Sequence, residues 1–167
     1  MTKNKTTQLK NTRQTFIPYG RQNVDADDIK AVVKVLKSDW LTQGPAVKEF
    51  EDSLARYCDA KYAVAVSNGT TALHLAYLAA GLGQGDEVIT TPHTFISTSE
   101  AIIWQGASPV FVDIDDNHQI DVDQIERRIT NKTKAILFVD MYGHTPDIDR
   151  LREIADRHNL YLVEDAA

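Results

Sequence analysis

The chain has 167 residues, 43% of them hydrophobic, and a formal net charge of −6 at pH 7. This length suits one globular domain with a substantial core, and acidic charge of mixed sign argues against a nucleic-acid partner, which needs a basic face. One cysteine excludes an internal disulfide framework, the scattered histidines argue against a metal site, and no apolar run reaches the roughly 18 residues of a membrane span.

The N-terminal region begins with a polar segment and continues with two predicted helices. Residues 1–15 are basic and polar and lack the apolar stretch of a signal peptide, so we expect a disordered tail and a cytoplasmic protein. From Asp25 onward apolar residues recur at helical spacing, with Asp25 as the expected N-cap. A second amphipathic helix is predicted after Pro45, and the intervening SDWLTQGP has no period and is predicted to be a loop.

After Lys61, short apolar runs alternate with amphipathic segments. The runs predict strands at 62–66, 87–91, 109–114, 135–140 and 160–164, and the segments between them predict helices at 70–82, 96–105, 122–129 and 147–158. Gly106 is the expected C′ residue that ends the second of these helices. Strands that are apolar on both faces and alternate with helices are typical of an α/β fold, a mostly parallel sheet flanked by helices.

Ligands of such sheets bind beyond the carboxyl ends of the strands, where this sequence places SNGT. The N–H groups of Gly69, Thr70 and Thr71 would point out of a helix N-terminus, which favours an anion. Ordinary N-capping by Ser67 or Asn68 is the alternative interpretation, and the pattern leaves both open. The sequence has no G-x-x-x-x-G-K, so SNGT is not a Walker loop. GLGQG is not a dinucleotide fingerprint, because its glycines follow a helix and precede a strand.

Two further residues follow strand ends. Phe95 can stack on a planar ring, although an isolated phenylalanine more often fills a core. Asp165, flanked by Glu164 and two alanines, can hold a protonated heterocyclic nitrogen by a charge-assisted bond, or can cap whatever helix follows.

Seven blocks of the sequence carry a resemblance to one family. They are Tyr19, SDWLTQGP, AVSNGTTALHLA, GDEVITTPHTF, GASPVFVDID, TKAIL and VEDAA. In this order and spacing they resemble the DegT/DnrJ/StrS family of sugar-nucleotide aminotransferases that depend on pyridoxal 5′-phosphate. The resemblance runs from about Ile17 to the last residue. It implies that 16–167 form the N-terminal part of the cofactor-binding domain, the incomplete large domain of a fold-type I transferase.

The resemblance also implies roles for individual residues. Asn68, Gly69 and Thr70 would bind the cofactor phosphate, Phe95 would stack on the pyridine ring, and Asp165 would bind the ring nitrogen. The residues implied to line the sugar-nucleotide site are Tyr19, Asp39, Trp40, Leu41, Thr42 and Gly69.

Within the family, the PYG opening and SDWLTQGP are most similar to the aminotransferases of the pseudaminic acid pathway. This similarity implies C4 amination of a UDP-linked 4-keto-6-deoxy-N-acetylhexosamine, for a bacterial surface glycan or nonulosonic acid. Glutamate is the expected amino donor, and a homodimer is expected for the complete enzyme.

One departure from the family lies at the C-terminal end. Members continue from EDAA to a Ser-x-x-x-x-Lys segment, whose lysine binds the cofactor covalently, and then to a small C-terminal domain, and neither is in this sequence. The lysines present precede strands, lie on polar helix faces, or occur in the tail and in turns. We therefore expect the N-terminal part of an aminotransferase that is inactive alone. A catalytically inactive remnant that binds the cofactor or a sugar nucleotide is the alternative.

Overall fold

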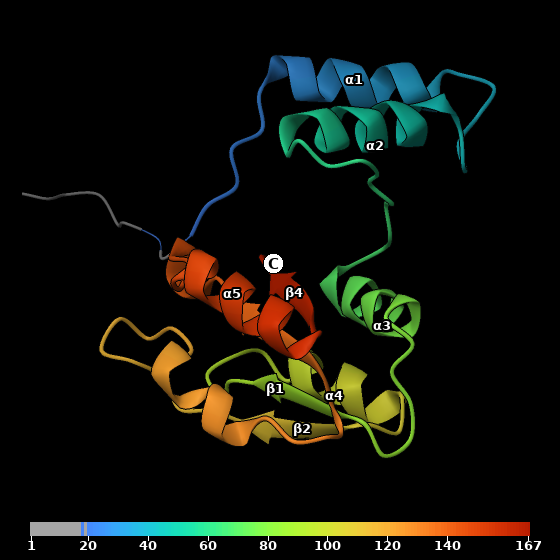
Figure 1. The fold of residues 1–167 in the computed structure, drawn as a ribbon. Helices are drawn as coiled ribbons and strands as arrows, with labels where there is room; N and C mark the ends of the chain where they lie inside the picture. The colour runs from blue at the N-terminus through green and yellow to red at the C-terminus, as the bar shows by residue number, and fades with distance from the viewer. Residues whose placement is uncertain (1–17, 19) are drawn as a thin grey trace, which may run out of the picture. The chain divides into compact units, whose positions relative to one another are not determined.

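The computed structural model describes residue 18 and residues 20–167, so the predicted tail over 1–15 and Tyr19 lie outside the described residues. Two compact units divide between Ala63 and Val64, and each is described by itself (Figure 1). The first carries two helices, and the second carries the sheet.

The N-terminal unit contains the two predicted helices, α1 (Ala26–Leu36) and α2 (Pro45–Tyr57). The carboxylate of Asp25 accepts from the N–H groups of Asp27 and Asp28, and Asp28 accepts in turn from the N–H of Asp25. This reciprocal capping box satisfies orphan donors at the start of α1, which confirms the predicted N-cap. Pro45 begins α2, where its missing N–H costs no helical hydrogen bond.

The second unit contains a four-stranded parallel sheet in the order β2-β1-β3-β4. Its strands are β1 (Glu87–Thr90), β2 (Ser108–Phe111), β3 (Thr133–Val139) and β4 (Tyr161–Asp165). The central strand β3 pairs with β4 from Ala135 opposite Tyr161 to Val139 opposite Asp165. The register therefore brings Asp165 to the end of the sheet where β3 also ends.

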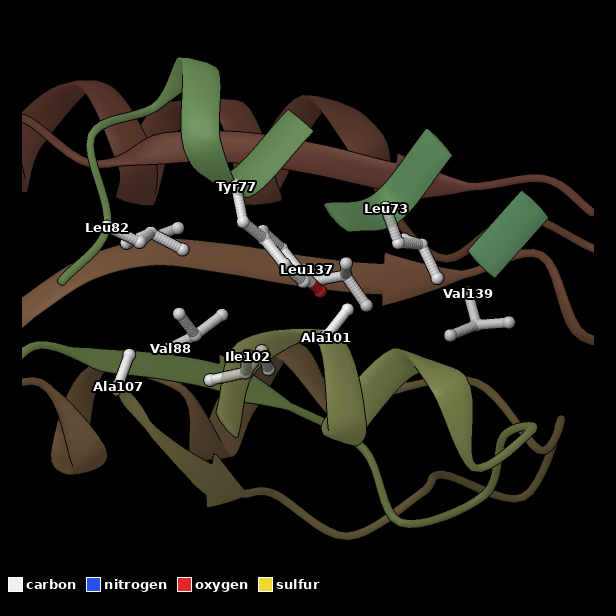
Figure 2. Close-up of a cluster of buried hydrophobic side chains, with 10 residues drawn as sticks. Leu73, Tyr77, Leu82, Val88, Ala101, Ile102, Ala107, Leu137 and Val139 are labelled. Carbon is white, nitrogen blue, oxygen red and sulfur yellow. The ribbon is translucent and has the colours of Figure 1, made fainter. Parts of the chain in front are cut away.

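Helices cover both faces of this sheet, as the strand pattern predicted. They are α3 (Gly69–Ala79), α4 (Ser97–Trp104) and α5 (Ile148–His158). Leu137 and Val139 of β3 belong to one buried cluster with residues of α3 and α4, and Figure 2 shows these side chains meeting between helices and strands. Ile136 and Phe138 belong to a second cluster with residues of α5. The alternation along β3 thus builds a core on each side of the sheet.

Two predicted elements are wrong. Residues 62–66 form no strand, because a strand needs a hydrogen-bonded neighbour and this segment pairs with none of the strands that the structure describes. The predicted helix over 122–129 is instead two 3₁₀ turns, Val122–Gln124 and Glu126–Arg128. Apolar residues three apart, Val122 and Ile125, lie on one side of either kind of helix, so their spacing did not distinguish the two.

The end of α4 depends on a glycine, as predicted. Gly106 follows the last residues of the helix with φ +78°, a left-handed conformation that side chains with a Cβ disfavour. A Cβ there would also lie 3.3 Å from Cα of Gln84. Both constraints fix the turn from α4 into β2, and with it the position of the helix.

Within residues 18 and 20–167, no helix combines the length and the apolar character needed to cross a membrane. The same residues contain no group of three or more His, Cys, Asp and Glu side chains arranged to hold a metal ion.

Candidate active site

A cavity of about 440 Å³ lies at the carboxyl ends of the strands in the second unit. This volume is within the roughly 300–1,000 Å³ of ordinary small-molecule sites. The start of α3, the segments after β1 and β3, and the end of β4 all contribute to its wall. Among the lining residues are Gly69, Thr70, Thr94, Phe95, Tyr142 and Asp165.

The start of α3 offers open N–H groups to this cavity. Asn68 is the N-cap, and its side-chain oxygen accepts from the N–H of Thr71 at 2.9 Å and from the Thr71 hydroxyl at 3.0 Å. Asn68 is therefore an ordinary N-cap, which is one of the two interpretations that the sequence left open. It is not among the residues lining the cavity. The N–H groups of Gly69 and Thr70 have no acceptor among the described residues, so an anion can still bind there.

Asp165 places a carboxylate at the other side of the cavity. Its side chain is only 9% exposed. Oδ2 accepts from the hydroxyl of Thr98 at 2.9 Å, and Oδ1 accepts from the N–H of Ala167 at 3.3 Å. Each carboxylate oxygen can accept more than one hydrogen bond, so both retain room for a ligand donor.

Thr98 belongs to a buried network that the sequence did not reveal. Its hydroxyl lies 2.7 Å from that of Thr94, and its carbonyl accepts from the hydroxyl of Tyr77 at 3.3 Å. Burial, and then the charge of Asp165, raise the pKa of Tyr77, so the phenol remains a donor. The only sequence signal was a pair of threonines four apart, which is also the spacing of an ordinary helical turn.

Phe95 is 71% exposed and lines the cavity. Its ring is thus not a core filler, and one of its faces can stack on a planar ligand. Tyr142, also in the cavity wall, has φ 59° and is 67% exposed. Sequence reasoning did not single out Tyr142, because a tyrosine after a strand carries no signal of its own.

The remaining predicted substrate residues, 39–42, lie in the loop between α1 and α2 of the first unit. The Ser38 hydroxyl lies 3.2 Å from the N–H of Trp40 and 3.1 Å from its carbonyl oxygen, which holds the loop backbone. A Cβ at Gly44 would lie 2.7 Å from Cβ of Trp40, so only glycine allows this return of the chain. The Trp40 side chain is 62% exposed and lines a cavity of about 410 Å³ within the first unit.

Glu164 adjoins Asp165 on β4 and interacts with Asp140, the residue after β3. Glu164 is exposed as a whole, but partial burial of its carboxyl, and then the Asp140 carboxylate, raise its pKa above the ordinary value of 4.5. A carboxyl whose folded-state pKa is raised contributes its full stabilisation below pH 4.5 and loses it as the pH rises through the raised value.

We therefore expect Glu164→Gln to stabilise the full-length protein at pH 8, because the amide carries no charge to bury or repel. Because Glu164 is exposed, solvent screens its charge, so Tm should rise by only about 1 °C, and the gain should shrink as the pH approaches 4.5. Calorimetry across this pH range measures the effect. Glu153→Gln, an exposed position on α5, is the control and should leave Tm unchanged. An equal gain from Glu164→Gln at every pH would contradict the assignment.

Comparison with known proteins identifies the family. The sequence profile of the DegT/DnrJ/EryC1/StrS aminotransferase family matches residues 22–167. The chain belongs to this family.

Individual relatives agree with this membership. Over 153 residues the chain is 44% identical to the UDP-4-amino-4-deoxy-L-arabinose–oxoglutarate aminotransferase of Shewanella sediminis, covering 91% of this chain and 39% of that protein. It is 33% identical to the PMP form of the putative sugar aminotransferase Spr1654 of Streptococcus pneumoniae, with a TM-score of 0.86 over 90% of this chain and 42% of that one. Helicobacter pylori PseC, an aminotransferase involved in pseudaminic acid biosynthesis, is 31% identical, with a TM-score of 0.84 over 90% and 41% of the two chains.

The chain spans about 40% of the length of the curated relatives that it matches. These structural matches confirm the predicted fold class, the parallel sheet of pyridoxal-phosphate-dependent aminotransferases. Pyridoxal 5′-phosphate is the cofactor of the family, and solved neighbours hold it in both its PLP and PMP forms.

The residues of the cavity fit this cofactor. Open N–H groups at a helix N-terminus suit its phosphate, and a buried carboxylate suits its ring nitrogen. A Cβ at Gly69 would approach Cβ of Ala167 to 3.2 Å, so the absence of a side chain there keeps the wall beside the helix start open. Four of the five predicted cofactor residues, Gly69, Thr70, Phe95 and Asp165, line this one cavity.

Proposed function

We propose that this protein transfers an amino group to a keto sugar carried by a nucleotide, with pyridoxal 5′-phosphate as cofactor. The observation that carries the proposal is the pairing of two anchors in one cavity, the buried Asp165 carboxylate and the open N–H groups of α3. A cofactor with a phosphate at one end and a basic ring nitrogen at the other needs both.

Four residues of the cavity wall have definite tasks in this proposal. The N–H groups of Gly69 and Thr70 and the Thr70 hydroxyl bind the phosphate, and Phe95 covers one face of the ring and keeps water from it. Asp165 holds a proton at the ring nitrogen through a charge-assisted bond. When bound, the cofactor supplies an electron-accepting ring that stabilises negative charge on the carbon that loses its proton.

We propose a UDP-linked 4-keto-6-deoxy-N-acetylhexosamine as the acceptor and glutamate as the donor. The names of two relatives support these choices, since one names a UDP-sugar and oxoglutarate and the other is an aminotransferase involved in the biosynthesis of pseudaminic acid. Asp39, Trp40, Leu41 and Thr42 would contact the sugar nucleotide, together with Gly69 and with Tyr19, which lies outside the described residues. The homodimer remains an expectation from the family resemblance, as does one cofactor-binding domain over 16–167.

The proposal is tested with the full-length protein, glutamate and the UDP-4-keto sugar. Mass spectrometry should detect a UDP-4-amino sugar and an equal amount of 2-oxoglutarate. A product from dTDP-linked keto sugars alone would overturn the UDP assignment. No amino transfer to any nucleotide-linked keto sugar would overturn the proposed reaction.

A second candidate, cofactor binding without transamination, is favoured for residues 1–167 by the position of the lysines. Within the described residues, no lysine lines the cavity that contains Asp165. Lys132 and Lys134, for example, flank the start of β3, at the opposite end of the strand from Asp140.

We expect residues 1–167 to show no lysine modified stoichiometrically by pyridoxal phosphate after borohydride reduction, because no described lysine reaches the cavity. Peptide mapping by mass spectrometry measures the label at each site. The Shewanella relative, treated identically, is the positive control. Stoichiometric labelling of one lysine in residues 1–167, together with amino transfer to the sugar, would contradict this expectation.

A further inference from the structure

The hydroxyl protons around Asp165 can be assigned from the hydrogen bonds. A threonine hydroxyl has one proton, and that of Thr98 goes to Oδ2 of Asp165, since an ionised carboxylate only accepts. In the 2.7 Å contact between Thr94 and Thr98, the donor must then be Thr94. The two hydroxyls point in series toward the carboxylate, and such chains polarise one another in the same direction.

Thr98 is also fixed by its surroundings. Its side chain is fully buried, and its carbonyl accepts from Tyr77, itself fully buried in α3. Thr98 lies in the first turn of α4, whose end is set by Gly106. A side chain that is held at both its backbone and its hydroxyl can hold a neighbouring group in turn.

We propose that Thr98, supported by Thr94, is a positioning residue that orients the Asp165 carboxylate toward the ring nitrogen of the cofactor. This inference rests on the proposed function and adds to it a buried relay, Thr94–Thr98–Asp165, that no part of the family assignment supplies. The relay uses Oδ2 of Asp165 and, with the Ala167 N–H on Oδ1, leaves the carboxylate little freedom to rotate. Orientation matters because a charge-assisted hydrogen bond is directional.

The test compares two ligands of the same shape in the full-length protein. Pyridoxamine phosphate carries the ring nitrogen, whereas its 1-deaza analogue carries a C–H there. The ratio of their dissociation constants reports the contact between Asp165 and the nitrogen, and it cancels any loss of fold or of phosphate binding that affects both ligands equally.

We expect the wild-type protein to prefer pyridoxamine phosphate and Thr98→Val to lower that preference roughly five- to tenfold, which is less than the loss of a direct hydrogen bond to a charged group because Thr98 acts on the ligand only through Asp165. Thr98→Ser keeps the hydroxyl and should restore the preference. Thr94 donates to Thr98 and not to Asp165, so Thr94→Val removes only the first donor of the relay and should lower the preference by about two- to threefold. Ser99→Ala, the next residue of α4, is the control.

The possible results distinguish the positioning role of Thr98 from the proposed role of Asp165. A loss of preference in Asp165→Asn together with an unchanged preference in both Thr98→Val and Thr94→Val would overturn the positioning role alone. An equal loss in Thr98→Val and Thr98→Ser would also overturn it, because shape and not the hydroxyl would then decide. A wild-type protein that binds both ligands equally would overturn the proposed role of Asp165, and the relay with it.

Discussion

Asp165→Asn in the full-length protein is expected to lower the rate of amino transfer by roughly 10²–10³-fold, a loss typical of removing one preorganised electrostatic contact. An amide has the shape of the carboxylate but carries no charge to keep the ring nitrogen protonated, so the ring withdraws electrons less strongly. The fold should persist, because the amide oxygen can still accept the hydroxyl proton of Thr98. Single-turnover kinetics with glutamate measures the loss directly.

A matched control separates charge at the cavity from charge elsewhere. Asp156→Asn makes the same chemical change on the exposed face of α5 and should leave the rate unchanged. Cofactor retention and circular dichroism of Asp165→Asn report whether the variant is loaded and folded. A loaded, folded variant with near-normal turnover would refute the role assigned to Asp165.

The second large effect is expected at the phosphate end. Thr70→Val keeps the branched shape of the side chain and removes the hydroxyl, so the affinity for pyridoxamine phosphate should fall by roughly 10- to 100-fold, as for a hydrogen bond to a charged group. Affinity for pyridoxamine, which lacks the phosphate, should hardly change. Isothermal titration with the two ligands measures both values.

Thr71→Val is the control for this second variant, because it tests the helix cap without touching the cavity. The Thr71 hydroxyl lies against Oδ1 of Asn68, and the N–H that makes the principal capping bond survives the substitution. We expect a small loss of thermal stability and an unchanged affinity. A loss of pyridoxamine phosphate binding as large as that of Thr70→Val would show that cap stability and not phosphate contact is being measured.

Much of the fold could be predicted because local pattern and tertiary structure agree. The apolar spacing after Asp25 correctly predicted the helix α1, and the short apolar runs after Lys61 correctly predicted the strands β1 to β4. Parallel strands end at one edge of a sheet, so residues that follow those ends, such as Phe95 and Asp165, converge in one cavity. The prediction did not depend on how far apart Phe95 and Asp165 lie in the sequence.

The features that could not be predicted depend on contacts between segments that lie far apart in the sequence. Residues 62–66 have strand composition, but strand formation is decided by a neighbouring strand. Thr98 is fully buried beside Asp165 although it is a polar residue in a helix, and nothing local distinguishes it from a surface threonine. The pairing of Glu164 with Asp140 likewise arises from the register of β3 and β4, which composition does not encode.

The hydrogen bond between Tyr77 and Thr98 joins the helix that begins at Gly69 to the helix that orients Asp165. Folding therefore sets the span between the anion-binding end and the carboxylate end of the cavity before any ligand arrives. The entropic cost of bringing the two anchors together is met by the protein core and not by the binding event. Such a cavity discriminates among otherwise similar pyridine compounds by the distance between their phosphate and their ring nitrogen.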